Sequence, residues 1–249
     1  MRALSVAKKD WRELPGYFKI STIIVPAMMI FVIGTFIFTA GTSDAIEDLP
    51  NLPDSLFPPG STDLDRSLYF AVNIMAPPFF LMLATMLPIT IAADAFAGER
   101  ERKTLEALLV VPMSSRDLFL GKSLLPLAYG FGASLVAFLV TTIMVNVGFP
   151  DATISMPNLT WLILIFLSVP AFSMLGILVQ LLISTRVDRT YFAVQIGSLI
   201  ILPILVFFIG GITGILLMGP TLLLAVTGGI VLLDYILFQI GSDSLARGL

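Results

Sequence analysis

The sequence predicts an all-α membrane protein with six transmembrane helices, an N-terminal interfacial helix, and a cytoplasmic helix between spans two and three. Composition, the length of the uncharged stretches and the placement of cations lead to this prediction. Of the 249 residues, 57% are hydrophobic and only 12% are charged, whereas soluble domains carry about 25% charged residues. Such a chain has too few polar residues to cover a folded surface in water, so its solvent must be lipid.

The uncharged stretches set the number of spans. They cover residues 20–43, 67–93, 123–150, 152–185 and 190–233. A helix needs about 20 apolar residues to cross a bilayer. The first four stretches each fit one crossing, and the last is long enough for two, with a turn in its glycine-rich part near 210–220. We expect one transmembrane domain, 1–249, with spans near 20–42, 68–97, 120–147, 159–184, 190–211 and 219–240.

The distribution of cations supports this count. With six spans and a cytoplasmic N-terminus, thirteen of the 14 Lys and Arg residues lie inside and only Arg66 lies outside. Lysine and arginine are enriched in cytoplasmic loops. The sequence therefore predicts a multi-pass protein of the cell (plasma) membrane with both termini cytoplasmic, and an acidic, proline-rich external loop over residues 43–67.

Residues 2–14 precede the first span. Apolar residues recur there at helical spacing, with basic residues between them: Leu4, Ala7, Trp11 and Leu14 alternate with Lys8, Lys9 and Arg12. A helix of this kind lies in the membrane interface, with its basic face toward anionic headgroups. A basic leader that only sets topology fits the same residues.

A charged segment, 98–119, separates the second and third spans. Leu105, Leu108, Leu109 and Pro112 fall at i, i+3, i+4 and i+7, which predicts an amphipathic helix. Glu99 and Lys103 have the spacing of a favourable helical ion pair. Pro112 ends this helix, and Ser114 with Asp117 predicts the start of the next. We therefore expect two helices joined by a tight turn beneath the bilayer.

This segment resembles that of the type-2 ABC exporter permeases, the six-span membrane subunits of ATP-binding-cassette transporters. Their pattern is Glu-Arg/Lys-Glu-x-Gly-Thr-Leu-Glu-x-Leu-Leu-x-x-Pro-x-Ser, followed by Gly-Lys at the third span. From Glu99 to Ser114 this chain reads Glu-Arg-Glu-Arg-Lys-Thr-Leu-Glu-Ala-Leu-Leu-Val-Val-Pro-Met-Ser, and Gly121-Lys122 follows. Lys103 stands where the pattern often has glycine, so the local bend is the point of difference.

The resemblance implies an exporter permease in which segment 98–119 forms a coupling helix, which links ATP hydrolysis on a separate ATPase subunit to substrate movement. It also implies a homodimer, or pairing with a related permease, within the lipid bilayer. The docking surface would comprise Thr104, Leu105, Glu106, Leu108, Leu109 and Pro112, and the hinge would comprise Glu99, Arg100 and Glu101. From the pattern alone, a charged loop that only anchors two spans fits equally well. The alternative function is a membrane subunit that passes ATPase motion to a partner protein without moving a solute.

Other function classes find little support. The chain has no cysteine and no histidine, which argues against thiol chemistry, the usual metal sites and histidine proton relays. Gly121-Lys122-Ser123 looks like the end of a phosphate-binding loop, but Arg116 stands where that loop needs glycine. We expect a non-catalytic subunit with no cofactor, no metal and no nucleic-acid partner.

A few polar residues lie within the predicted spans. Asp234 and Gln180 form a possible intramembrane polar site, because an acid in a span usually faces a cavity or the bundle interior. A position near the inner headgroups would explain Asp234 equally well. Hydrogen bonds between helices, rather than ligand binding, are expected of Gln180, Gln195, Asn73 and Asn146. Gly130-x-x-x-Ser134 predicts a close helix approach, at a subunit interface or elsewhere.

Overall fold

A computed structural model describes residues 8, 10, 12, 16–42, 57, 59–103, 114–187, 189–213 and 219–246. All regular structure in these residues is helical. Within the described ranges, six helices are long and apolar enough to cross a membrane: Ile23–Thr42, Asp63–Gly98, Arg116–Gly148, Leu159–Ser184, Thr190–Gly211 and Pro220–Asp243. The predicted fold class, an all-α membrane protein with six spans, is confirmed.

Several of these helices are built from consecutive segments. The first and third are the single helices α2 (Gly16–Thr42) and α7 (Ser115–Gly148), and the sixth is α12 (Pro220–Ala246). The second comprises α3 (Asp63–Tyr69), η3 (Phe70–Met75), α4 (Ala76–Ala93), η4 (Asp94–Gly98) and α5 (Glu99–Glu101). The fourth comprises α8 (Leu159–Ile163), η5 (Leu164–Ser168) and α9 (Val169–Ser184), and the fifth comprises α10 (Thr190–Gly197), η6 (Ser198–Ile200) and α11 (Ile201–Ile212).

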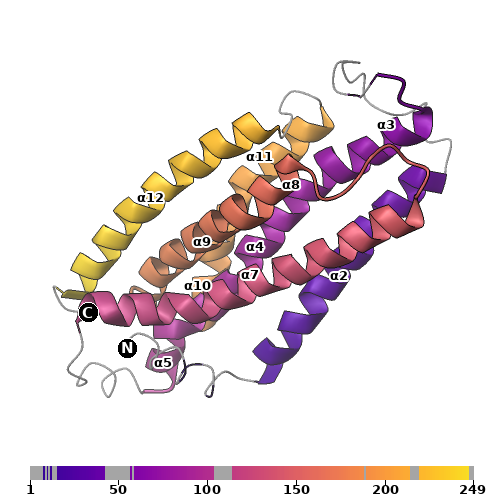
Figure 1. Cartoon of the computed structure of the whole chain (residues 1–249). Coiled ribbons are helices and arrows are strands. Elements are labelled where there is room, and N and C mark those ends of the chain that lie inside the picture. Colours follow the sequence, from indigo (N-terminus) through magenta and orange to yellow (C-terminus); the bar gives the residue numbers. More distant parts are fainter. Residues whose placement is uncertain are drawn as a thin grey trace.

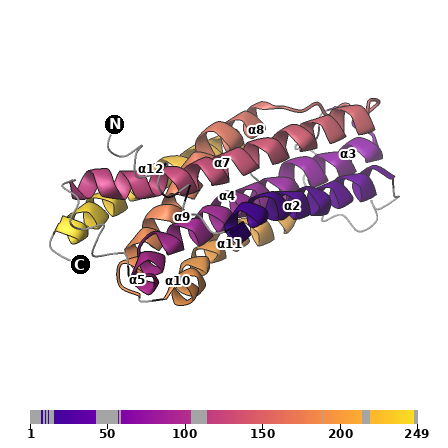
Figure 2. The same ribbon diagram turned by 90° about the horizontal axis from the view of Figure 1, so that it is seen from below.

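The second and fourth helices form the centre of the bundle. Figure 1 shows α4 and α9 between α12 on one side and the pair α2 and α7 on the other, and Figure 2 shows the bundle from below. Within the most apolar window, 78% of the residues of the second helix are buried, against 17% for the fifth and the sixth. The outer helices therefore present apolar side chains to lipid or to a partner.

Small residues bring the central helices together. Gly176 of α9 lies against Ile89 of α4, and the Ser173 hydroxyl donates to the Ala84 carbonyl across the same interface at 2.7 Å. Small side chains allow close backbone approach where lipid provides no hydrophobic driving force. Gly130 of α7 likewise packs on Ala84, so the close approach predicted there lies within the chain.

Two of the π-helical turns directly precede prolines. Pro77 and Pro78 follow η3, and Pro170 follows η5. A proline lacks the backbone N–H and its ring clashes with the carbonyl four residues earlier. A wider π turn moves that carbonyl away, so each helix continues past its proline with little disruption.

Of the two asparagines expected to link helices, Asn73 of the second helix bonds to the N-cap residue of α8 in the fourth helix, whereas Asn146 fastens the loop between α7 and α8. Asn158 Nδ2, at the start of α8, donates to Asn73 Oδ1 at 2.7 Å. Asn146 donates to the Met156 carbonyl at 2.6 Å and accepts from the Met156 N–H at 3.0 Å. This end of the bundle is held by hydrogen bonds, whereas the opposite end, at α5, carries the charges described below.

Several predictions fall outside the described residues. Of the predicted interfacial helix 2–14, only residues 8, 10 and 12 are described, and all three are helical. Residues 43–56 of the external loop and residues 214–218 of the glycine-rich turn are also outside the described part.

Candidate functional site

The junction between the second and third helices is the candidate site. Glu99, Arg100 and Glu101 form α5, and the chain returns to the bundle at Ser114. The six residues predicted to shape the docking surface lie in 104–113, outside the described residues: Thr104, Leu105, Glu106, Leu108, Leu109 and Pro112. The structure therefore describes the two roots of the predicted coupling segment: the first root is α5, before residue 104, and the second root is the start of α7 at Ser114.

A buried lysine joins three distant parts of the chain at this junction. Lys122 Nζ on α7 lies 2.7 Å from Glu99 Oε1 on α5 and 3.1 Å from Asp10 Oδ1. The Lys122 side chain is 1% exposed and that of Glu99 is 3% exposed. Burying a charge in this way is costly unless partners compensate it. The first root is therefore bound both to α7 and to the N-terminal segment.

A second ion pair closes the turn after α5. The Arg102 guanidinium donates to both oxygens of Asp94, at 3.0 and 3.1 Å. This bidentate geometry is the strongest that arginine forms with a carboxylate. Gly98 leaves the space for it, because a Cβ there would lie 1.9 Å from Asp94 Oδ1. Both ion-pair groups line one small cavity of about 30 Å³, which is room for a single water molecule.

Glu101 connects the same root to the fifth helix. Its carboxylate accepts hydrogen bonds from the backbone N–H of Thr190 at 3.1 Å and from the Thr190 hydroxyl at 3.2 Å. Thr190 is the first residue of α10. A carboxylate at a helix N-terminus satisfies a free N–H and complements the helix dipole. Movement of α5 would therefore reach α10 directly.

Lys103 adopts a left-handed backbone conformation, with φ of 57°. Glycine adopts this conformation at no steric cost, which gives a physical reason for the glycine at the corresponding place in the exporter pattern. The predicted helical pair between Glu99 and Lys103 is wrong, because α5 ends at Glu101 and Glu99 binds Lys122 instead.

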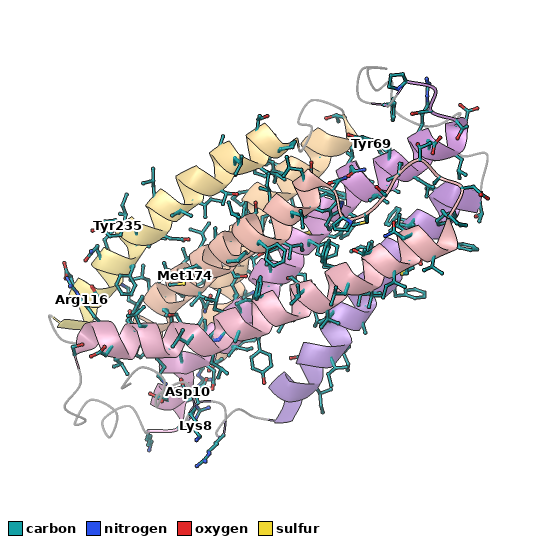
Figure 3. The ribbon with its side chains drawn as sticks, in the orientation of Figure 1. Lys8, Asp10, Tyr69, Arg116, Met174 and Tyr235 are labelled. Carbon is teal, nitrogen blue, oxygen red and sulfur yellow. The ribbon has the colours of Figure 1, made fainter. Side chains whose placement is uncertain are left out.

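The second root begins with a capped helix, as predicted. Ser114 is the N-cap of α7, and its Oγ accepts from the Asp117 N–H at 3.1 Å. The same hydroxyl donates to Asp117 Oδ2 at 2.7 Å. Figure 3 shows Arg116 at this end of α7, and Lys8 and Asp10 beside α5. Both roots of segment 104–113 are thus fixed by hydrogen bonds or ion pairs.

Gly121, Lys122 and Ser123 lie within α7 rather than in a loop before a helix. The lysine is bound to two carboxylates, so these residues do not have the geometry of a phosphate-binding loop. No group of His, Cys, Asp and Glu suited to a metal ion occurs in the part of the chain that the structure describes.

The two intramembrane polar residues are not joined to each other. Gln180 is fully buried on α9 against Gly197 of α10, and neither of its amide atoms has a hydrogen-bond partner in the described residues. Asp234 is 9% exposed on α12, and its Oδ1 also has no partner there. They remain two separate buried polar groups.

Sequence reasoning missed the partners of the junction. Asp10 lies within a basic leader and Lys122 at the edge of an apolar span, and neither position suggests an ion pair. The one available signal was a lysine next to apolar residues, which needs a compensating charge if it is buried. Nothing in the local sequence of Thr190 indicates its bond to Glu101.

Comparison with curated proteins gave no match. The sequence model of a family described as ABC-2 family transporter protein matches residues 45–227, which include segment 98–119 and more than half of the chain. The protein is therefore a multi-pass membrane permease that belongs to the ABC-2 family of transporter proteins.

Proposed function

We propose that this permease works as an exporter, and that its segment 98–119 couples ATP hydrolysis on a separate ATPase chain to substrate movement. The observation that carries the proposal is the bracing of both roots of that segment. Glu99 and Lys122 join α5 to α7, and Glu101 joins α5 to α10. A coupling element has to be stiff at its roots, because a loose loop would absorb the movement of the ATPase.

The bracing suggests how a movement would spread. Segment 104–113 continues directly into α5 and α7, so a shift of the segment acts on the second and third helices first. Through Glu101 it acts on the fifth helix, and through Lys122 on the N-terminal segment at Asp10. The central helix α4 would tilt together with the outer helices on both sides, which is what a change of access across the membrane requires.

The distribution of charge supports a cytoplasmic junction. Among the cations whose side chains the structure describes, eight lie at or beside the α5 end: Lys8, Arg12, Arg102, Lys103, Arg116, Lys122, Arg186 and Arg189. Arg66 lies at the α3 end. By the positive-inside rule the α5 end faces the cytoplasm. Both termini would then be cytoplasmic in a plasma membrane.

The exposed apolar surface supports assembly with a second permease chain. The fifth and sixth helices and α2 are largely exposed in a single copy. We propose that two copies, or this chain and a related permease, pair within the bilayer above two ATPase subunits. The alternative is a subunit that transmits ATPase motion to a partner protein without moving a solute, and a transport assay separates the two.

The docking role is tested by replacing Leu105 and Leu108 together with aspartate. We expect the ATPase, identified by mass spectrometry through its nucleotide-binding sequence, to be lost from the purified complex. Leu159→Asp, at the first position of α8 at the opposite end, is the control and should retain it. Resistance to carbonate extraction shows that each variant is inserted. Unchanged co-purification of the ATPase with the double variant would contradict the proposal.

A further inference from the structure

A groove runs between the half of α2 that is nearest the junction and the middle of α7. It has a volume of about 520 Å³ and is lined by residues within 23–30 of α2 and 128–136 of α7. None of these lining residues is charged, and only Tyr129 carries a hydroxyl. The volume is within the range of about 300–1,000 Å³ that is typical of ligand sites.

The groove exists because α2 and α7 separate toward the junction. At the opposite end Gly34 packs on Met144 and Gly41 packs on Phe149, which holds the two helices together. Toward the junction the helices diverge, as Figures 1 and 2 show. A Cβ on Gly132 would meet no atom within 4 Å, so small residues keep this part of the groove open.

The rim of the groove faces the surroundings of the bundle. Ile23 is 74% exposed and Val136 is 55% exposed. An apolar hollow gives water too few hydrogen-bond partners to be filled by it. From Ala128 to Val136 the groove extends about 12 Å along the middle of α7, a length comparable with the roughly 15 Å of hydrocarbon in one leaflet. These properties suit an acyl chain.

Charged residues lie beyond the end of the groove that is nearest the junction, outside its lining. Lys122 lies on α7 about 10 Å before Tyr129 along the helix axis and on the same face. The carboxylates there are bound in ion pairs, at Glu99 and Asp10. Lys8 and Arg12 flank Asp10 in sequence and are exposed, and Figure 3 shows Lys8 beside Asp10 near α5. The exposed side chains of this segment therefore offer positive charge to a headgroup.

We propose that the groove binds one acyl chain of an anionic phospholipid of the cytoplasmic leaflet, with the headgroup at Lys8 and Arg12. This inference rests on the proposed function in one respect: the assignment to the cytoplasmic leaflet assumes that the junction faces the cytoplasm. The bound lipid would fill the space between α2 and α7 and link the N-terminal segment to the third helix.

The full chain is tested without an ATPase in nanodiscs of phosphatidylcholine and phosphatidylglycerol at 3:1. The probe is phosphatidylglycerol with a diazirine in its acyl chain. After illumination, peptide mapping should find the label concentrated in 23–30 and 128–136. Gly132→Leu should reduce this label several-fold, whereas Gly228→Leu, which also places a side chain in open space on an exposed part of α12, should not.

The headgroup is tested with the same probe. Lys8→Gln and Arg12→Gln should each lower the labelling at low salt by about fivefold, the effect expected of one cation at an anionic surface. A phosphatidylcholine probe should label the groove weakly and without dependence on these residues. Even labelling of all lipid-facing helices, or equal loss in both glycine variants, would overturn the proposal.

The proposal would also be overturned if the probe did not label the groove and the Gly132→Cys variant formed a disulfide between two copies of the chain. That result would identify the groove as a protein interface. Failure of the ATPase to bind the chain would leave the labelling result unaffected. The two proposals can therefore fail independently.

Discussion

Replacing Lys122 with methionine should destabilise the protein more than any loss of a surface cation. The lysine side chain is 1% exposed and its partner Glu99 is 3% exposed, with 2.7 Å between Nζ and Oε1. Removing one partner of such a pair leaves a buried charge uncompensated, which costs about 3–5 kcal/mol. In a chain of this length, 1 kcal/mol corresponds to about 2–4 °C in Tm, so we expect Tm to fall by roughly 6–20 °C.

The assay is thermal denaturation in detergent, with the remaining monodisperse protein measured by fluorescence-detected size-exclusion chromatography. Lys103→Met is the matched control, since Lys103 is exposed and the described residues show no ion pair for it. A substitution of this kind should change the free energy of unfolding by no more than about 0.5 kcal/mol.

A double variant separates the buried charge from a general packing defect. Adding Glu99→Gln to Lys122→Met removes the stranded carboxylate, and the remaining partner, Asp10, is 16% exposed and can be hydrated. The double variant should be more stable than the sum of the single effects, by about 1–3 kcal/mol. If Lys122→Met lowers Tm no more than Lys103→Met does, or if the effects are additive, the ion-pair reasoning is wrong.

Three further predictions concern single positions. Gly98→Ala should lower Tm, because a Cβ would displace the Asp94 carboxylate from its arginine, whereas Gly148→Ala, which meets no atom within 4 Å, should not; equal effects would contradict the packing argument. Lys103→Gly should stabilise the protein by about 1 kcal/mol, because a residue with a side chain is strained in the left-handed conformation and glycine is not. Lys103→Ala should give no such gain. If glycine does not raise Tm, the turn is not strained. Trp161→Ala should destabilise by about 3–5 kcal/mol, since this fully buried ring packs edge-on at 4.9 Å and stacked at 5.8 Å against two phenylalanines; a loss below about 1 kcal/mol would show that the core relaxes around the gap.

The membrane fold was predictable because the bilayer imposes simple requirements. A span in lipid has to satisfy its own backbone hydrogen bonds, so a long uncharged stretch is a helix. The high hydrophobic content then predicts that the protein lies in lipid. The charged residues between the uncharged stretches predict the number of transmembrane helices. The cap at Ser114 was also predictable, because capping depends on residues that are close in sequence.

Contacts between distant segments were not predictable in the same way. The pairing rule that linked Glu99 to Lys103 assumes that the helix continues, but α5 ends at Glu101 and Lys103 is left-handed. The true partner of Glu99 is on α7, and no local spacing encodes that distance. Single-sequence patterns also do not reveal the π turns, which depend on how a helix relieves a proline within its packed surroundings.

The claim that segment 98–119 is held by an ATPase is tested most directly by crosslinking at Leu105 in intact cells. A photoreactive amino acid is placed at position 105. Because the chain has no cysteine, one introduced cysteine would be the unique site for a thiol label in a parallel experiment. The account predicts an adduct with an ATP-binding-cassette ATPase, and none from the same residue at position 159 at the other end of the bundle. The claim would be contradicted by an adduct with lipid alone. It would also be contradicted if the Leu105→Cys variant reacted with a membrane-impermeant thiol reagent added outside the cell.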